Sequence, residues 1–390
     1  MHSSIFPSRP DRPSQRGGGC NYDGTGPCVL LCFRRFDSAG SNSRLESHSL
    51  VSLKVGLLYS SILFNRRRAL AGIGSACACM SMAIGDDTNS SGLDDAEVQA
   101  PTRLQFDSPQ VQRYRIGLIL ETPVTCVNAL ATFPVPISWP EQEVRVIGQE
   151  IDPLVTKWGP RDLVPRAKQL VVEMNRVPAG AKVEVTFEVE VKRSRILPPE
   201  QTDDLVIPKR LPREISKLYM GNSPFIDASS SIVRKASREV AKQDAEDAWH
   251  RVEQIYDYVR DNVEYVEGNL KNASDALKDG KGDCEEMTSL FVAMCRNNRI
   301  PARVVWIPDH CYPEFYLEDA EGNGFWFPCQ AAGTRQFGRM DEYRPVLQKG
   351  DRFKLPEKPR QVRYVSEFFS CLPQGKGTPR PQFIRDRIDL

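Results

Sequence analysis

The sequence predicts an α+β protein in which an antiparallel β-sandwich is followed by a domain that begins with helices and ends with strands. Alternation of apolar and charged residues, typical of half-buried strands, recurs over residues 101–198. Helical periodicity begins at residue 229, and strand-like runs continue to residue 335. A chain of 390 residues is long enough for two or three domains with a large core.

Composition excludes several classes of function. The net charge is +1 with both signs evenly mixed, so nothing indicates binding to nucleic acid or electrostatic binding to a membrane surface. No run is long and apolar enough for a stable transmembrane helix. The eleven cysteines are an odd number without CxxC spacing, which predicts neither a disulfide framework nor a zinc ribbon. We therefore expect no cofactor.

Residues 1–100 are expected to be a disordered leader and linker, because the first 50 are rich in Ser, Gly, Arg and Pro without periodicity. Within the leader, residues 65–83 combine an arginine cluster at 66–68 with small, weakly apolar residues. This segment resembles a twin-arginine export signal, a bacterial device, and translation would then begin later than Met1, near Val51. We expect export to the periplasm or cell envelope; a cytoplasmic protein with a disordered leader is the alternative.

Residues 101–198 read as a small antiparallel β-sandwich of immunoglobulin-like kind. The strand at residues 182–192 alternates almost perfectly, so one of its faces is expected to be solvated, and a turn at Ala179-Gly180 precedes it. The segment contains no cluster of acids and bases, which favours a recognition or positioning domain. The expected strands are residues 114–120, 143–147, 169–174 and 182–192.

The second domain is predicted over residues 229–335, after a proline-rich connector at 199–228. A helix is expected over residues 229–242 and a longer amphipathic helix over 245–262. After the domain, residues 336–390 are polar and proline-rich, so they are expected to be an extension that wraps the surface, with no role assigned. The apolar face of the longer helix consists of Ala248, Trp249, Val252, Ile255, Tyr256 and Val259.

Cys284 stands at the first position of a further predicted helix. Asp283 is a good N-cap, and Glu286 completes an Asp-x-x-Glu capping box. The helix dipole and the unpaired backbone N–H groups there favour a thiolate. The flanking carboxylates oppose that effect, so a nucleophilic Cys284 needs a base nearby. The apolar face of this helix consists of Met287, Leu290, Phe291 and Met294.

His310 is the candidate base among four histidines, because it opens a strand that follows the strand at residues 302–306. A cysteine at a helix start and a histidine on a following strand are typical of enzymes that transfer acyl groups through a thiol. The alternatives are a purely structural pair, or a zinc site formed by Cys284, His310, Cys311 and Cys329. Joint coordination is disfavoured because neighbouring strand residues point to opposite faces.

These segments resemble the transglutaminase-like superfamily. Residues 277–305 carry its Gly-Asp-Cys start, its apolar helix and its Ile-Pro-Ala-Arg-Val turn. Residues 310–316 resemble the histidine strand, with Tyr312 where a tryptophan is usual, and residues 325–330 resemble the third strand. The resemblance covers about residues 240–335. It implies a papain-like fold, with the cysteine helix packed on an antiparallel sheet, and a cysteine acyltransferase or peptidase acting on protein or peptide amides.

By the same resemblance the catalytic residues are Cys284, His310 and Gln330, but the family normally has aspartate at the third position. A glutamine can accept the ring N–H and fix the tautomer, yet it supplies no counter-charge. The chain is therefore either an active enzyme with Gln330 as orienter or an inactive binding module. Asp309 or Glu314 would replace Gln330 if its side chain faced away. The backbone N–H of Cys284 would donate to the oxyanion, with Tyr265 or Gln330 as candidate second donor.

Overall fold

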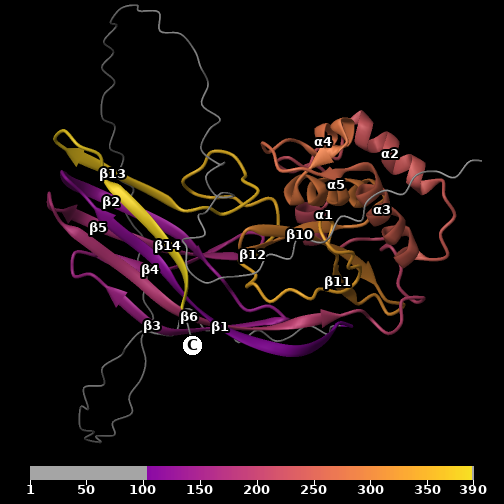
Figure 1. The fold of residues 1–390 in the computed structure, drawn as a ribbon, viewed down its shortest axis with the longest axis horizontal. Helices are drawn as coiled ribbons and strands as arrows, with labels where there is room; N and C mark the ends of the chain where they lie inside the picture. The colour runs from indigo at the N-terminus through magenta and orange to yellow at the C-terminus, as the bar shows by residue number, and fades with distance from the viewer. Residues whose placement is uncertain (1–102, 389–390) are drawn as a thin grey trace, which may run out of the picture. The chain divides into compact units, whose positions relative to one another are not determined.

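The computed structural model describes residues 103–388 (Figure 1). The predictions for the leader and linker, including the signal-like segment at residues 65–83, lie outside the described residues. Within the described range, no helix is long and apolar enough to cross a membrane. The elements combine antiparallel sheets with helices, which confirms the predicted α+β class.

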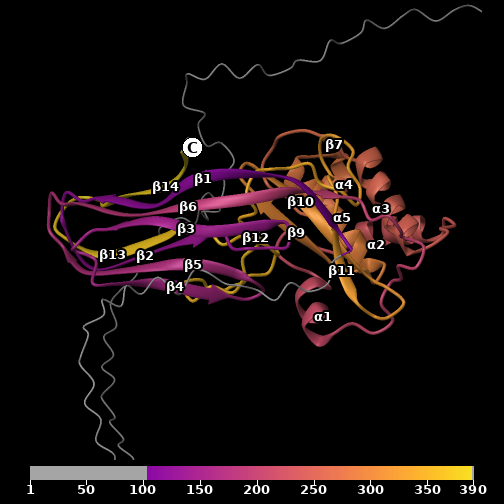
Figure 2. The ribbon, with the colours of Figure 1, turned by 90° about the horizontal axis from the view of Figure 1, so that it is seen from below.

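Residues 105–197 form the strands of an antiparallel β-sandwich, whose two sheets lie face to face (Figure 2). Strand alternation creates its core: Val183, Val185 and Phe187 are fully buried, while Glu184 and Glu188 point outward. One sheet has the order β14-β1-β6-β3 and the other β13-β2-β5-β4. The strands from this segment are β1 (Gln105–Glu121), β2 (Thr125–Val135), β3 (Gln142–Ile151), β4 (Lys157–Leu163), β5 (Ala167–Val177) and β6 (Lys182–Leu197).

The C-terminal segment corrects the prediction of a surface extension over residues 336–390. Strand β13 (Phe368–Gln374) pairs with β2, and β14 (Arg380–Ile388) pairs with β1, so the segment supplies one edge strand to each sheet of the sandwich. Pro373 and Pro381 lie within these strands, and proline is tolerated at a sheet edge because one side of the strand needs no ladder. Because of these prolines, the sequence predicted loops rather than strands in this segment.

The second region is built around helix α5 (Cys284–Asn297), which packs on the antiparallel sheet β11-β10-β9-β12 (Figure 1). The sheet consists of β9 (Ala302–Ile307), β10 (His310–Glu318), β11 (Gly324–Pro328) and β12 (Gln348–Lys349). A parallel two-stranded ladder joins β7 (Glu264–Tyr265) and β8 (Lys281–Gly282). The other helices are α1 (Arg213–Tyr219), α2 (Ser231–Ala241), α3 (Ala248–Asn262) and α4 (Ala273–Asp279).

Buried polar contacts fix the position of this sheet. Arg193 of β6 is 1 % exposed and donates hydrogen bonds to the Tyr312 hydroxyl (2.9 Å) and to the Glu342 carbonyl (3.0 Å). At the end of α5, Arg296 donates two hydrogen bonds to Asp351, at 2.8 and 2.9 Å, with both side chains fully buried. The sandwich is thus hydrogen-bonded to the strand that begins with His310.

Candidate active site

Helix α5 begins at Cys284 because its capping groups are all in place. The Asp283 side chain accepts the backbone N–H of Glu285 at 2.8 Å, and the Glu286 carboxylate accepts the backbone N–H of Asp283 at 2.9 Å. Gly282 is required before the cap, since a Cβ there would lie 2.7 Å from the Glu286 side chain. Gly280 ends α4 with a φ of 65°, which favours glycine.

The Cys284 thiol, 7 % exposed, lies in surroundings that favour its thiolate. The Cys311 thiol contributes most to lowering the pKa of Cys284, against the effect of burial, when its proton turns from the Cys284 carbonyl oxygen to the Cys284 sulfur. A hydrogen bond to His310 and attraction to the imidazolium charge lower it further, to about 5 from an ordinary value of 9.0. The charge of Asp283 acts in the opposite direction. Together these effects favour the thiolate at neutral pH.

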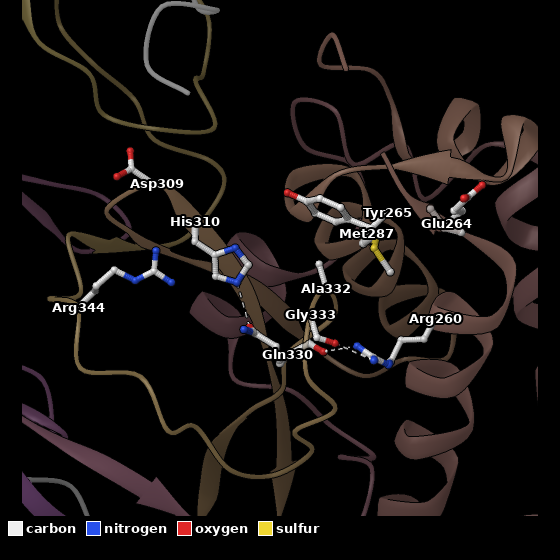
Figure 3. A pocket seen from close by; sticks show the side chains of 11 residues that line it. Arg260, Glu264, Tyr265, Met287, Asp309, His310, Gln330, Ala332, Gly333 and Arg344 are labelled. Carbon is white, nitrogen blue, oxygen red and sulfur yellow. Dashed lines mark hydrogen bonds between the residues drawn. The ribbon is translucent and has the colours of Figure 1, made fainter. Parts of the chain in front are cut away.

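His310 opens strand β10 and connects Cys284 with Gln330. Its Nε2 lies 3.1 Å from the Gln330 side-chain oxygen (Figure 3). Because an amide oxygen only accepts, Nε2 carries the proton in this contact, and Nδ1 is left for the thiol. Burial alone would lower the pKa of His310, but the hydrogen bond and charge of Cys284, with the Gln330 contact, hold that pKa above its usual value.

Gln330 is held in place by helix α3 through its backbone. Its carbonyl accepts the Tyr256 hydroxyl at 2.8 Å and the Arg260 guanidinium at 3.1 Å. Arg260 also donates to the carbonyls of Ala331 (3.1 Å) and Gly333 (2.9 Å). Figure 3 shows Gly333 beside Gln330. These bonds fix the loop after β11, so the amide of Gln330 points at the imidazole.

The carboxylates considered in place of Gln330 do not take that position. Glu314 is fully buried and accepts hydrogen bonds from Arg303 at 2.7 Å and from Lys349 at 2.6 Å. The two cations hold the pKa of Glu314 below its usual value despite burial. Asp309 lines the pocket next to His310, and its side chain is directed away from the imidazole in Figure 3.

Cys311 is the neighbour of Cys284 that sequence reasoning missed. Its sulfur lies 3.5 Å from the Cys284 carbonyl oxygen, and it is buried under α5. Strand alternation predicts that the side chains of His310 and Cys311 point to opposite faces, but both residues lower the pKa of Cys284. Among residues 103–388, no three or more His, Cys, Asp or Glu side chains are grouped so that they could hold a metal ion.

A pocket of about 610 Å³ opens beside His310 and Gln330 (Figure 3). Tyr265 of β7, 52 % exposed, lines it together with Met287. Two cations and two carboxylates also line it, so the pocket has no dominant charge. They are Arg260, Arg344, Glu264 and Asp309.

Comparison with known proteins gives a family match and similar solved structures. Residues 234–331 match the family model of the Transglutaminase-like superfamily. No curated protein matches the chain. A solved structure of a candidate cysteine protease from Cytophaga hutchinsonii is similar at 15% identity and a TM-score of 0.44, over 74% of this chain and 93% of that one. A candidate protease from Parabacteroides distasonis is similar at 10% identity and a TM-score of 0.24, over 60% of this chain and 48% of that one.

Both TM-scores are below 0.5, so neither solved structure assigns a role to a residue of this chain. The family match covers α3, α5, the strand β10 that begins with His310, and the strand β11 together with Gln330 after it. Within these limits, residues 234–331 form a domain of the transglutaminase-like superfamily.

Proposed function

We propose that the protein is a thiol-dependent enzyme that transfers or hydrolyses the acyl group of protein or peptide amides. The observation that carries the proposal is the 3.1 Å contact between Nε2 of His310 and the side-chain oxygen of Gln330, together with the mutual effect of His310 and Cys284 on each other's pKa. A nucleophile, a base and a group that orients the base are the parts such chemistry needs. The adjacent pocket gives an amide substrate room to reach His310.

In the proposed reaction, the Cys284 thiolate attacks the amide carbonyl carbon, and the carbonyl oxygen becomes an oxyanion. The backbone N–H of Cys284, at the start of α5, is the proposed first donor to that oxyanion. The imidazolium of His310 then protonates the leaving amine, and the C–N bond breaks to leave a thioester. In the second half, His310 takes a proton from water or from an acceptor amine as that molecule attacks the thioester, and the C–S bond breaks to release the acid or the new amide and to restore the Cys284 thiolate.

Gln330 replaces the orienting function of a carboxylate without its charge. Its oxygen keeps the proton of His310 on Nε2, so that Nδ1 faces the thiol. The counter-charge of the imidazolium is then supplied by the Cys284 thiolate, which is close enough to raise the pKa of His310. The proposed ground state is a thiolate–imidazolium pair, in which a neutral orienter suffices.

A second candidate is a binding module without turnover. It is favoured by the burial of Cys284, which is 7 % exposed and is not among the residues that line the pocket. In that case peptide substrates would bind beside His310 without reacting.

Single-turnover labelling distinguishes the two candidates. The full chain is incubated with a glutamine-containing protein substrate and a fluorescent primary amine, while ammonia release and new N-termini are measured in parallel. Amine incorporation indicates transfer, ammonia release indicates amidase activity, and new N-termini indicate peptidase activity. Each should vanish in Cys284→Ala. Binding of substrate with no product and no thioester in the native chain would overturn the enzyme proposal.

A further inference from the structure

Two cysteine sulfurs lie side by side in the β-sandwich, far along the chain from the candidate active site. The sulfurs of Cys126 on β2 and Cys371 on β13 are 3.2 Å apart. This is closer than two unbonded sulfurs usually sit, and about one ångström longer than a disulfide bond of roughly 2.05 Å. Cys126 is fully buried, and Cys371 packs against the same apolar core.

The strand register accounts for the approach. Strands β2 and β13 are antiparallel neighbours, with Cys126 opposite Pro373, and a bulge interrupts their ladder between Ser370 and Leu372. At this bulge Asn128 adopts a φ of 51°, and two residues of β2 lie opposite the single residue Cys371 of β13. A bulge increases the local twist, and this brings the diagonal neighbours Cys126 and Cys371 together on the inner face.

We propose that Cys126 and Cys371 form a disulfide that ties β13 to β2. Its formation removes two protons and two electrons from the two thiols, and a disulfide oxidant such as oxidised glutathione accepts them and becomes two thiols. The sandwich thereby gains a covalent bond between strands that are 245 positions apart in the sequence.

The bond is expected to form while β13 docks. Burial, together with the neighbouring Cys126, raises the pKa of Cys371 to about 12, so little thiolate exists once the sandwich is complete. During docking both thiols are still solvated and exchange at ordinary rates. Folding in an oxidising compartment is thus required, and the export predicted from residues 65–83 would provide one.

The disulfide would close a loop that contains the whole transglutaminase-like domain. Residues 234–331 lie between the two cysteines, so both chain segments that connect this domain to the sandwich would be retained by one bond. Because β13 is an edge strand, it is otherwise held by pairing on one side only. The bond would prevent this edge from fraying.

Peptide mapping tests the proposal directly. The full chain is produced in a bacterial periplasm and, separately, in a reducing cytoplasm, then alkylated with iodoacetamide under denaturing conditions and digested with trypsin without reductant. The periplasmic sample should yield the tryptic peptides 116–145 and 364–376 linked to each other, and the cytoplasmic sample should yield both in alkylated form. Full alkylation of both cysteines in the periplasmic sample, or their linkage to other cysteines, would overturn the proposal.

Thermal unfolding tests whether the disulfide stabilises the sandwich. Reductant should lower the melting temperature of the linked protein by several degrees, and Cys371→Ala should lose this sensitivity. Ser370→Ala is the matched control, because it alters the same bulge without removing a thiol and should keep the sensitivity. If reductant does not change the melting temperature of the linked protein, the disulfide does not stabilise the sandwich. Neither arm depends on catalysis, so its outcome is independent of the proposed enzyme activity.

Discussion

Replacing Cys311 by alanine removes the thiol that contacts Cys284 and leaves His310 and Gln330 in place. The Cys311 hydrogen bond is the largest cause of the low pKa of Cys284, which stands at about 5. A hydrogen bond to a charged group contributes about 1.5–3 kcal/mol, and a thiol is a weak donor, so the lower end applies. At 1.36 kcal/mol per unit, the pKa of Cys284 should rise by about one unit, to about 6.

The assay is the rate of Cys284 alkylation by iodoacetamide as a function of pH, with the labelled residue identified by mass spectrometry. At pH 5 the thiolate fraction should fall from about one half to about one tenth, so alkylation should slow about fivefold. Above pH 8 both proteins hold Cys284 as thiolate, and their rates should agree. This convergence separates a change in pKa from a general loss of structure.

Two variants complete the test. Cys311→Ser keeps a hydrogen-bond donor and should stay near the native profile. Cys295→Ala is the matched control, because it removes a thiol of α5 that is as buried as the Cys311 thiol. Burial raises the pKa of Cys295 well above its ordinary value. If Cys311→Ala leaves the profile unchanged, or if the serine variant behaves like the alanine variant, Cys311 does not stabilise the thiolate through its hydrogen.

Further predictions concern the imidazole and the fold. Gln330→Asp should raise the pKa of His310 and extend activity to higher pH, while Gln330→Ala should lower kcat on the order of 10²-fold without unfolding the protein; an unchanged pH profile and kcat would contradict the orienting role. The lowered pKa of Cys284 stabilises the folded thiolate form, and this stabilisation is lost as pH falls through about 5. The raised pKa of His310 stabilises the folded imidazolium form, and this stabilisation is lost as pH rises through the raised pKa of His310. The kcat/KM profile should therefore be bell-shaped, with limbs near pH 5 and above 6.5; a flat profile from pH 4 to 9 would refute the ion pair. Asp351→Ala leaves Arg296 buried without its carboxylate partner and should lower the free energy of unfolding, measured in urea, by about 3–5 kcal/mol. A loss below about 1 kcal/mol would contradict this prediction.

Features with local signals could be predicted from the sequence. The capping box of Asp283 and Glu286 lies within four residues and appears in the structure as its pattern implies. The longer amphipathic helix is α3, and the five large residues of its predicted apolar face are buried. The alternation of residues 182–192 recurs as strand β6, with its valines inside. In each case the interacting groups are near in sequence, so periodicity carries the information.

Features that depend on distant partners could not be predicted. The strands β13 and β14 are stabilised by β2 and β1, and their own sequence contains prolines that argue for loop. The contact between Cys311 and Cys284 arises from the packing of α5 on β10, which no spacing within either element reveals. A clue existed in the cysteine that directly follows His310, but strand alternation argued against it.

The pairing of β14 with β1 also constrains the order of events during synthesis. Glu121 pairs with Arg380, so the ribosome must add 259 residues before β14, the outer neighbour of β1, begins to exist. At about 5–20 residues per second this takes roughly 13–50 s. Throughout that time the outer side of β1 is an unpaired edge, open to other nascent chains. The sheet that packs on α5 ends with β12 at Lys349, so this region emerges before the sandwich can close. Tags or truncations near β14 should therefore lower the soluble yield more than the small area they touch would suggest.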